Sequence, residues 1–204
     1  MKRIAVVLGL WTLLLPMLMW ANVIKLADEY GSATLSDAGI TVTRSELTGF
    51  GLNWRHAPPG HDLGSLSFST GALISGSIMG GGLFSSTGSS FDVVGFGKYG
   101  VPNGTIFSGS FSGPIAWTLI SQTGNNYVFD LTGNLSGTTY TGRMVTGVTV
   151  QTIDVNQYQR GRIHGGNTLL GSTAIMWPEP PTLALFATGL IVIVGITRRK
   201  LFGA

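Results

Sequence analysis

The middle of the sequence alternates between apolar and polar residues, and this period of two constrains the fold more than any other feature. The longest example runs from Arg143 to Val155, where Thr and Gln interleave with Val and Ile. Shorter examples occupy residues 66–69, 106–111 and 127–131. Successive side chains of a β-strand point to opposite faces of a sheet, so the alternation predicts strands that bury one face.

Turn-forming residues separate these segments. Gly, Asn and Pro interrupt the alternation at intervals of roughly eight to twelve residues, which is typical of an antiparallel sandwich or barrel. A helix is possible here only near Val23 to Tyr30. We expect the glycine-rich residues 80–90 to form a loop and Gly165 to Thr173 to begin a tether. We therefore expect an all-β, antiparallel β-sandwich or barrel-like domain over residues 22–177, with strands at 33–36, 40–48, 64–70, 72–79, 90–96, 104–111, 114–121, 126–133 and 143–155.

Composition excludes several classes of function. Charged residues make up only 10% of the chain, against about 25% in an average soluble domain. The chain has no cysteine, which excludes thiol catalysis, disulfides and cysteine–zinc sites. The net charge of +3 comes from the two ends, because residues 22–177 hold seven Lys or Arg against eight Asp or Glu. We therefore expect no basic surface for nucleic acid.

Residues 1–21 have the layout of a secretory signal peptide. Lys2 and Arg3 precede an apolar run over residues 4–15, and a short stretch after Pro16 ends at Ala21. About a dozen apolar residues are too few for a membrane span, so we expect cleavage after Ala21. Met19 stands where a small residue is preferred, which leaves an uncleaved anchor as the alternative.

Residues 178–204 carry a second apolar segment. No residue from Pro181 to Thr197 is charged, and as a helix this stretch would span about 26 Å at ~1.5 Å per residue. Arg198, Arg199 and Lys200 follow it directly. We expect a single transmembrane helix with a basic stop, the alternative being a buried helix of a soluble domain. Positive flanks stay in the cytoplasm, so the two basic ends place the residues between them across the membrane.

A short motif precedes the second apolar segment. Pro178, Glu179 and Pro180 are followed by the apolar residues 183–197 and the basic stop, in a chain that begins with a signal-like segment. This arrangement resembles the PEP-CTERM sorting signal of Gram-negative bacteria, although Pro181 stands where that family often has Ser or Thr. The resemblance implies that the tail is a substrate of exosortase, a membrane-embedded cysteine transpeptidase, and that the protein reaches the cell surface or the exopolysaccharide and biofilm matrix. It covers residues 178–204 and implies nothing about the middle domain.

The middle domain shows no catalytic motif, so we expect a structural or adhesive domain that is not an enzyme and needs neither cofactor nor metal. A lectin-like, carbohydrate-binding module is the alternative, because aromatic rings stack on sugars. A glycan hydrolase ranks below it. The aromatic candidates are Trp54, Tyr99, Trp117, Tyr127 and Tyr140.

Two further patterns are weaker. His56, His61 and Asp62 flank an Ala-Pro-Pro-Gly segment, but their spacing fits neither a helix face nor alternate strand positions, so we interpret them as an exposed polar loop. Gly95 to Gly100 matches Gly-x-Gly-x-x-Gly. The following Val-Pro-Asn-Gly prevents the helix that a dinucleotide site requires, so this match is a chance one.

Overall fold

The computed structural model describes residues 23–51, 55–56, 61–155, 158–159, 162–163 and 165–176, and residues 22–177 form a compact unit. Within these ranges the regular structure is entirely β, and no helix of the described part is long and apolar enough to cross a membrane. The strands are β1 (Val23–Glu29), β2 (Ser32–Ser36), β3 (Gly39–Gly51), β4 (Arg55–His56), β5 (Gly64–Ser69), β6 (Leu73–Ser77), β7 (Gly81–Phe84), β8 (Ser90–Phe96), β9 (Asn103–Phe111), β10 (Ile115–Thr123), β11 (Asn126–Thr139), β12 (Met144–Val155), β13 (Tyr158–Gln159), β14 (Arg162–Ile163) and β15 (Gly166–Met176).

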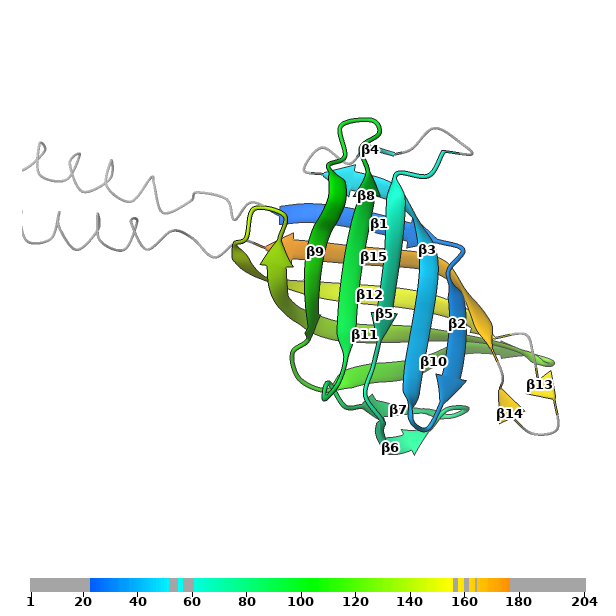
Figure 1. Ribbon diagram of the computed structural model, residues 1–204. Coiled ribbons are helices and arrows are strands. Elements are labelled where there is room, and N and C mark those ends of the chain that lie inside the picture. The colour runs from blue at the N-terminus through cyan, green and yellow to red at the C-terminus, as the bar shows by residue number, and fades with distance from the viewer. Residues whose placement is uncertain are drawn as a thin grey trace, which may run out of the picture. The chain divides into compact units, whose positions relative to one another are not determined.

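Eight of these strands close a barrel (Figure 1). Each pairs antiparallel with the next in the order β1, β3, β5, β8, β9, β11, β12 and β15, and β15 pairs back with β1. The ring follows chain order, so each wall strand lies beside the wall strands before and after it in the sequence. The predicted all-β, antiparallel class is confirmed, and of the two architectures expected, the barrel is the one formed.

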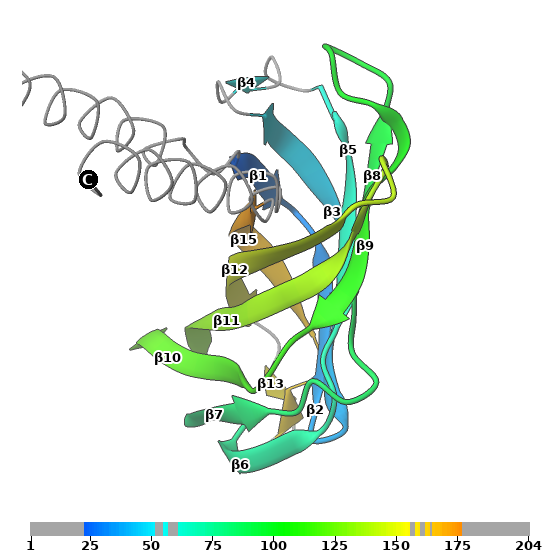
Figure 2. The ribbon, with the colours of Figure 1, turned by 90° about the vertical axis from the view of Figure 1, so that its left-hand side faces the viewer.

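Four of the remaining strands extend the barrel wall, and β13 and β14 pair with each other in a separate two-stranded sheet. β2 continues the line of β1 between β3 and β15, and β10 continues the line of β9 along β11. Along β11, Leu135 pairs with Phe111 at the end of β9, and Thr132 pairs with Ala116 near the start of β10. β7 then pairs with β10 and β6 with β7, which adds a short flap beyond β11 (Figure 2).

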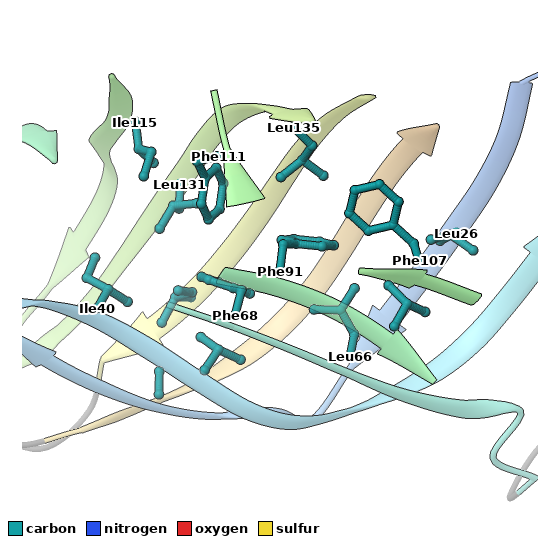
Figure 3. Close-up of a cluster of buried hydrophobic side chains, with 14 of the residues drawn as sticks. Leu26, Ile40, Leu66, Phe68, Phe91, Phe107, Phe111, Ile115, Leu131 and Leu135 are labelled. Atoms are coloured by element: carbon teal, nitrogen blue, oxygen red, sulfur yellow. The ribbon is translucent and has the colours of Figure 1, made fainter. Parts of the chain in front are cut away.

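Apolar side chains fill the barrel interior (Figure 3). Phe91 lies at the centre of an aromatic group, with its ring centroid 5.8 Å from those of both Phe68 and Phe111 and 6.1 Å from that of Phe107. These rings come from β5, β8 and β9, so their packing joins neighbouring walls of the barrel. Aromatic pairs at such distances add roughly 0.5–1.5 kcal/mol to the stabilisation that burial of their surface provides.

Two glycines make room for one of these rings. Gly109 and Gly137 face each other on β9 and β11, and a Cβ atom at residue 137 would lie 2.6 Å from the Cα of Gly109 and 2.8 Å from the Cζ of Phe107. The Phe107 ring therefore occupies space that any larger pair of residues would fill. The high glycine content of the sequence is, at this point, a packing requirement.

All nine predicted strand ranges overlap observed strands, but two other predictions are wrong. Residues 81–84 form β7 within the segment expected to be a loop, and residues 166–176 form β15 rather than a tether. Residues 23–29, where a helix was possible, form β1. The alternation of apolar and polar residues is interrupted in β1, because Ala27 and Asp28 are both buried at a register shift. β7 is glycine-rich, yet it ends in the fully buried Phe84.

We expect Gly137→Ala to destabilise the protein by about 1–3 kcal/mol, because the new methyl group meets backbone and ring atoms that cannot move apart without strain. Urea unfolding of the two proteins measures the change. Gly80→Ala is the matched control, because a Cβ there meets only the Ser77 hydroxyl, at 3.0 Å. Equal losses in the two variants would contradict the packing role of Gly137.

Candidate functional site

The two ends of the described chain lie side by side on the barrel (Figure 1). Val23 at the start of β1 faces Met176 at the end of β15. The turns between β8 and β9 and between β11 and β12 belong to the same end of the barrel, because neighbouring strands alternate in direction. We call this the chain-end rim. The expected sorting and processing residues lie outside the described residues, so the structure does not place Ala21, Pro178, Glu179, Pro180, Arg198, Arg199 or Lys200.

Two of the predicted sugar-stacking residues belong to the core. Trp117 is buried, its ring stacks on Phe129 with centroids 4.4 Å apart, and its indole N–H donates to the carbonyl oxygen of Ile78 at 2.9 Å. Tyr127 is partly buried and also packs against Phe129, at 6.5 Å. Trp117 is therefore a core residue and not available for stacking on a sugar, while Tyr127 packs against the core through its contact with Phe129. Trp54 lies outside the described residues.

The other two aromatic candidates are exposed on the chain-end rim. Tyr99 is 48% exposed in the β8–β9 turn, and Tyr140 is 55% exposed in the β11–β12 turn. The His61 ring meets the Tyr99 ring edge-on, with centroids 5.6 Å apart. Phe96, at the end of β8, is 43% exposed. Phe96 was not among the sequence candidates, because the strand alternation says nothing about exposure at a strand end.

The polar residues near His61 have a structural role. Asp62 accepts a hydrogen bond from the backbone N–H of Gly64 at 2.9 Å, which fixes the entry into β5. No group of three or more His, Asp and Glu residues in the described part of the chain is placed to hold a metal ion. The His56 side chain lies outside the described residues. Residues 95–100 end β8 and turn into β9, with Gly97, Tyr99 and Gly100 at positive φ.

A polar group inside the barrel spans the junction between the first and last strands. Asp28 of β1 faces Gly171 of β15, and Gly171 faces Gln151 of β12. Residues on one rung point to the same side of a sheet. Gly171 has no side chain, so the carboxyl and amide groups meet across it, and Gln151 Nε2 donates to Asp28 Oδ1 at 3.1 Å. A Cβ atom at residue 171 would overlap both groups.

Hydrogen bonds extend this contact over four strands. Ser45 Oγ on β3 donates to Asp28 Oδ2 at 2.7 Å, and Gln151 Nε2 also donates to Thr149 Oγ1 at 3.0 Å. Thr149 Oγ1 lies 2.8 Å from Thr173 Oγ1 on β15. We call these five residues the seam cluster, because they join β3, β1, β15 and β12 where the barrel closes. All five are buried, so a solute outside the barrel has no access to them.

Burial changes the acid–base chemistry of the cluster. Desolvation raises the pKa of Asp28, the hydrogen bonds from Ser45 and Gln151 offset part of this rise, and the nearby Glu29 adds to it. Gln151 Oε1 has no hydrogen-bond partner among the described residues. The seam cluster therefore holds the barrel closed while keeping a carboxyl group that resists ionisation.

Comparison with known proteins adds no assignment, because no family model, curated protein or solved structure matches this chain. The resemblance of the C-terminal tail to a sorting signal consequently rests on the residues of the tail.

We expect the stability of the protein to fall as the pH rises through the titration of Asp28. An unfolded Asp titrates near pH ~3.9. Between that pH and the raised pKa of the folded state, the folded chain binds more protons than the unfolded one, so the free energy of unfolding decreases. Asp28→Asn removes this ionisation and keeps the size of the side chain. Urea unfolding between pH 4 and 8 should show a decrease for the natural chain that the variant lacks.

Asp92→Asn is the control for this experiment, because Asp92 lies on the outer surface, where Ser108 donates a hydrogen bond to it. The control should keep the decrease. Identical pH profiles for the natural chain and Asp28→Asn would show that the buried carboxyl does not titrate in this range.

Proposed function

We propose that this chain is an exported β-barrel protein of the cell surface or of the exopolysaccharide and biofilm matrix. An N-terminal signal peptide directs its export, and a C-terminal helix holds it in the inner membrane until exosortase processes the tail at the Pro-Glu-Pro motif. The barrel has a structural or adhesive role after its release. The localisation rests on the sequence of the two ends, and the role of the barrel rests on its geometry.

The pairing of Val23 with Met176 is the observation that best supports this proposal. The wall of the barrel begins two residues after Ala21 and ends two residues before Pro178. Removal of the expected signal peptide and tail would therefore remove no strand and leave the β1–β15 junction intact. A domain built in this way can be processed at both ends and still keep its fold.

The outer surface suits contact with hydrated material. Along one rung, Ser67 on β5 faces Asp92 on β8, Asp92 faces Ser108 on β9, and Ser108 faces Thr138 on β11. On a neighbouring rung Ser69 and Ser90 lie with their hydroxyl oxygens 2.9 Å apart. The interior, by contrast, is filled by aromatic and aliphatic side chains. Interaction with a matrix would therefore use the hydroxyl-rich outer wall.

The mass of the mature protein tests this proposal. We expect the form isolated from the cell surface to begin near Asn22 and to lack most of residues 181–204. In the same cells, the Glu179→Ala variant should retain its tail. The natural chain should also retain its tail in cells without exosortase. A surface form that keeps residues 198–200 in cells that have the enzyme would refute the tail assignment.

A carbohydrate-binding role is the second candidate, and the exposed Tyr99 ring favours it. The exposed Asn103 follows the same turn as the first residue of β9, and its amide can supply hydrogen bonds to sugar hydroxyl groups. Tyr99→Ala should abolish any signal of the natural protein on a glycan array. Tyr30→Ala is a matched control, because Tyr30 is also exposed and also has a positive φ, but it lies between β1 and β2. Equal effects of the two changes would exclude a site at Tyr99.

A further inference from the structure

The geometry points to a lipid-binding surface on the chain-end rim, made by Tyr140, Arg143, Met144 and Met176. We call these four residues the rim patch and assign it to the headgroup region of a bilayer that contains anionic phospholipid. The inference rests on the proposed function, because it requires the C-terminal segment to tether the barrel to a membrane.

The two methionines of the rim patch share one outward face. Thr146 of β12 faces Met176 of β15, and Met144 lies two residues before Thr146, so its side chain points to the same side. Met144 is 64% exposed and Met176 is 37% exposed. Two neighbouring apolar side chains are thereby held in solvent beside the point where the chain leaves the barrel.

Tyr140 stands on a turn with a fixed backbone. The N–H of Thr139 donates to the carbonyl of Arg143 at 3.1 Å, and the N–H of Gly142 donates to the carbonyl of Thr139 at 2.8 Å. The N–H of Tyr140 itself donates to Ile106 of β9 at 3.0 Å. These bonds fix the backbone that carries the exposed ring at this end of the barrel. Tyrosine in such a position suits the boundary between water and lipid, because its ring is apolar and its hydroxyl group is polar.

The charges of the barrel are distributed unevenly. Of the Lys and Arg side chains that the structure describes, three lie in the rim turns or within three residues of a strand terminus at this end, namely Lys25, Lys98 and Arg143. Of the described acidic side chains, Asp62 alone meets that criterion, and it is bound to the N–H of Gly64. A cationic rim with exposed apolar side chains is attracted to an anionic lipid surface.

Chain length sets how far the rim can be from the membrane. Six residues separate Met176 from Leu183, where the apolar residues 183–197 begin. Even fully extended, six residues reach only about 20 Å, and the polar layer on each side of a bilayer takes up roughly 5–8 Å of that distance. The rim is therefore the part of the barrel that a tethered chain brings to the headgroups.

The absence of cysteine from the chain allows a direct test. Met144→Cys and Ile74→Cys, each labelled with the fluorophore NBD, would be prepared in the full-length chain and reconstituted into phosphatidylethanolamine–phosphatidylglycerol vesicles. The two positions are matched in exposure, at 64% and 61%, but Ile74 lies on the β6 flap. We expect a blue shift of the emission, and quenching by headgroup spin-labelled lipid, at residue 144 and neither effect at residue 74.

Two variants connect the effect to the patch. Tyr140→Ala and Arg143→Gln, in the Met144→Cys chain, should each weaken the quenching, and vesicles of phosphatidylcholine alone should weaken it as well. A label at Thr146→Cys gives a second reporter on the same face if Met144→Cys unfolds. Equal quenching at residues 144 and 74 in chains that float with the vesicles would overturn the rim patch and leave the tether intact. A chain that does not float with vesicles would overturn the tether and the patch together.

Discussion

The contact of Asp28 with Gln151 across Gly171 is the constraint on which the closed barrel depends. A sheet becomes a barrel only if its first and last strands pair, and here those strands are separated by almost the whole length of the domain. The seam cluster places hydrogen bonds between side chains on both sides of that junction, and Ser45 extends them to the next strand. An open sheet would separate the Asp28 carboxyl from the Gln151 amide that donates to it. Such a polar group inside an apolar core favours one register, because a slip by one residue would separate its members.

The rest of the core is mostly apolar. The aromatic group centred on Phe91 joins β5, β8 and β9, and a second group around Trp117 and Phe129 joins β10 and β11 to the flap through Phe84. Apolar packing of this kind is strong but weakly directional. The hydrogen bonds of the seam cluster select the closed arrangement. Apolar packing in the rest of the core supplies most of its stabilisation.

The sequence predicted the strands much better than the way they assemble. Alternation located nine strands because it depends only on neighbouring residues, whereas the pairing of β1 with β15 depends on residues about 150 positions apart. In β12 the alternation was found, but both of its faces are mixed. Thr149 and Gln151 point inward and Val150 is 37% exposed, so the pattern alone does not reveal which face is buried. For the same reason the seam cluster was not predicted, and Trp117 was grouped with Tyr99 as a candidate for sugar stacking.

The closed barrel also limits where the protein can interact with its surroundings. With the interior filled and the seam cluster buried, the surfaces that the described residues offer to a ligand include the hydroxyl-rich wall, the flap and the chain-end rim. These regions differ in chemistry. The wall carries small polar side chains that suit a hydrated polymer, while the rim carries exposed aromatic and methionine side chains with positive charge nearby. Because the chain enters and leaves at the rim, a tethered barrel would turn its wall and flap away from the membrane. One fold would thus separate a surface used during sorting from the surfaces left free for the matrix.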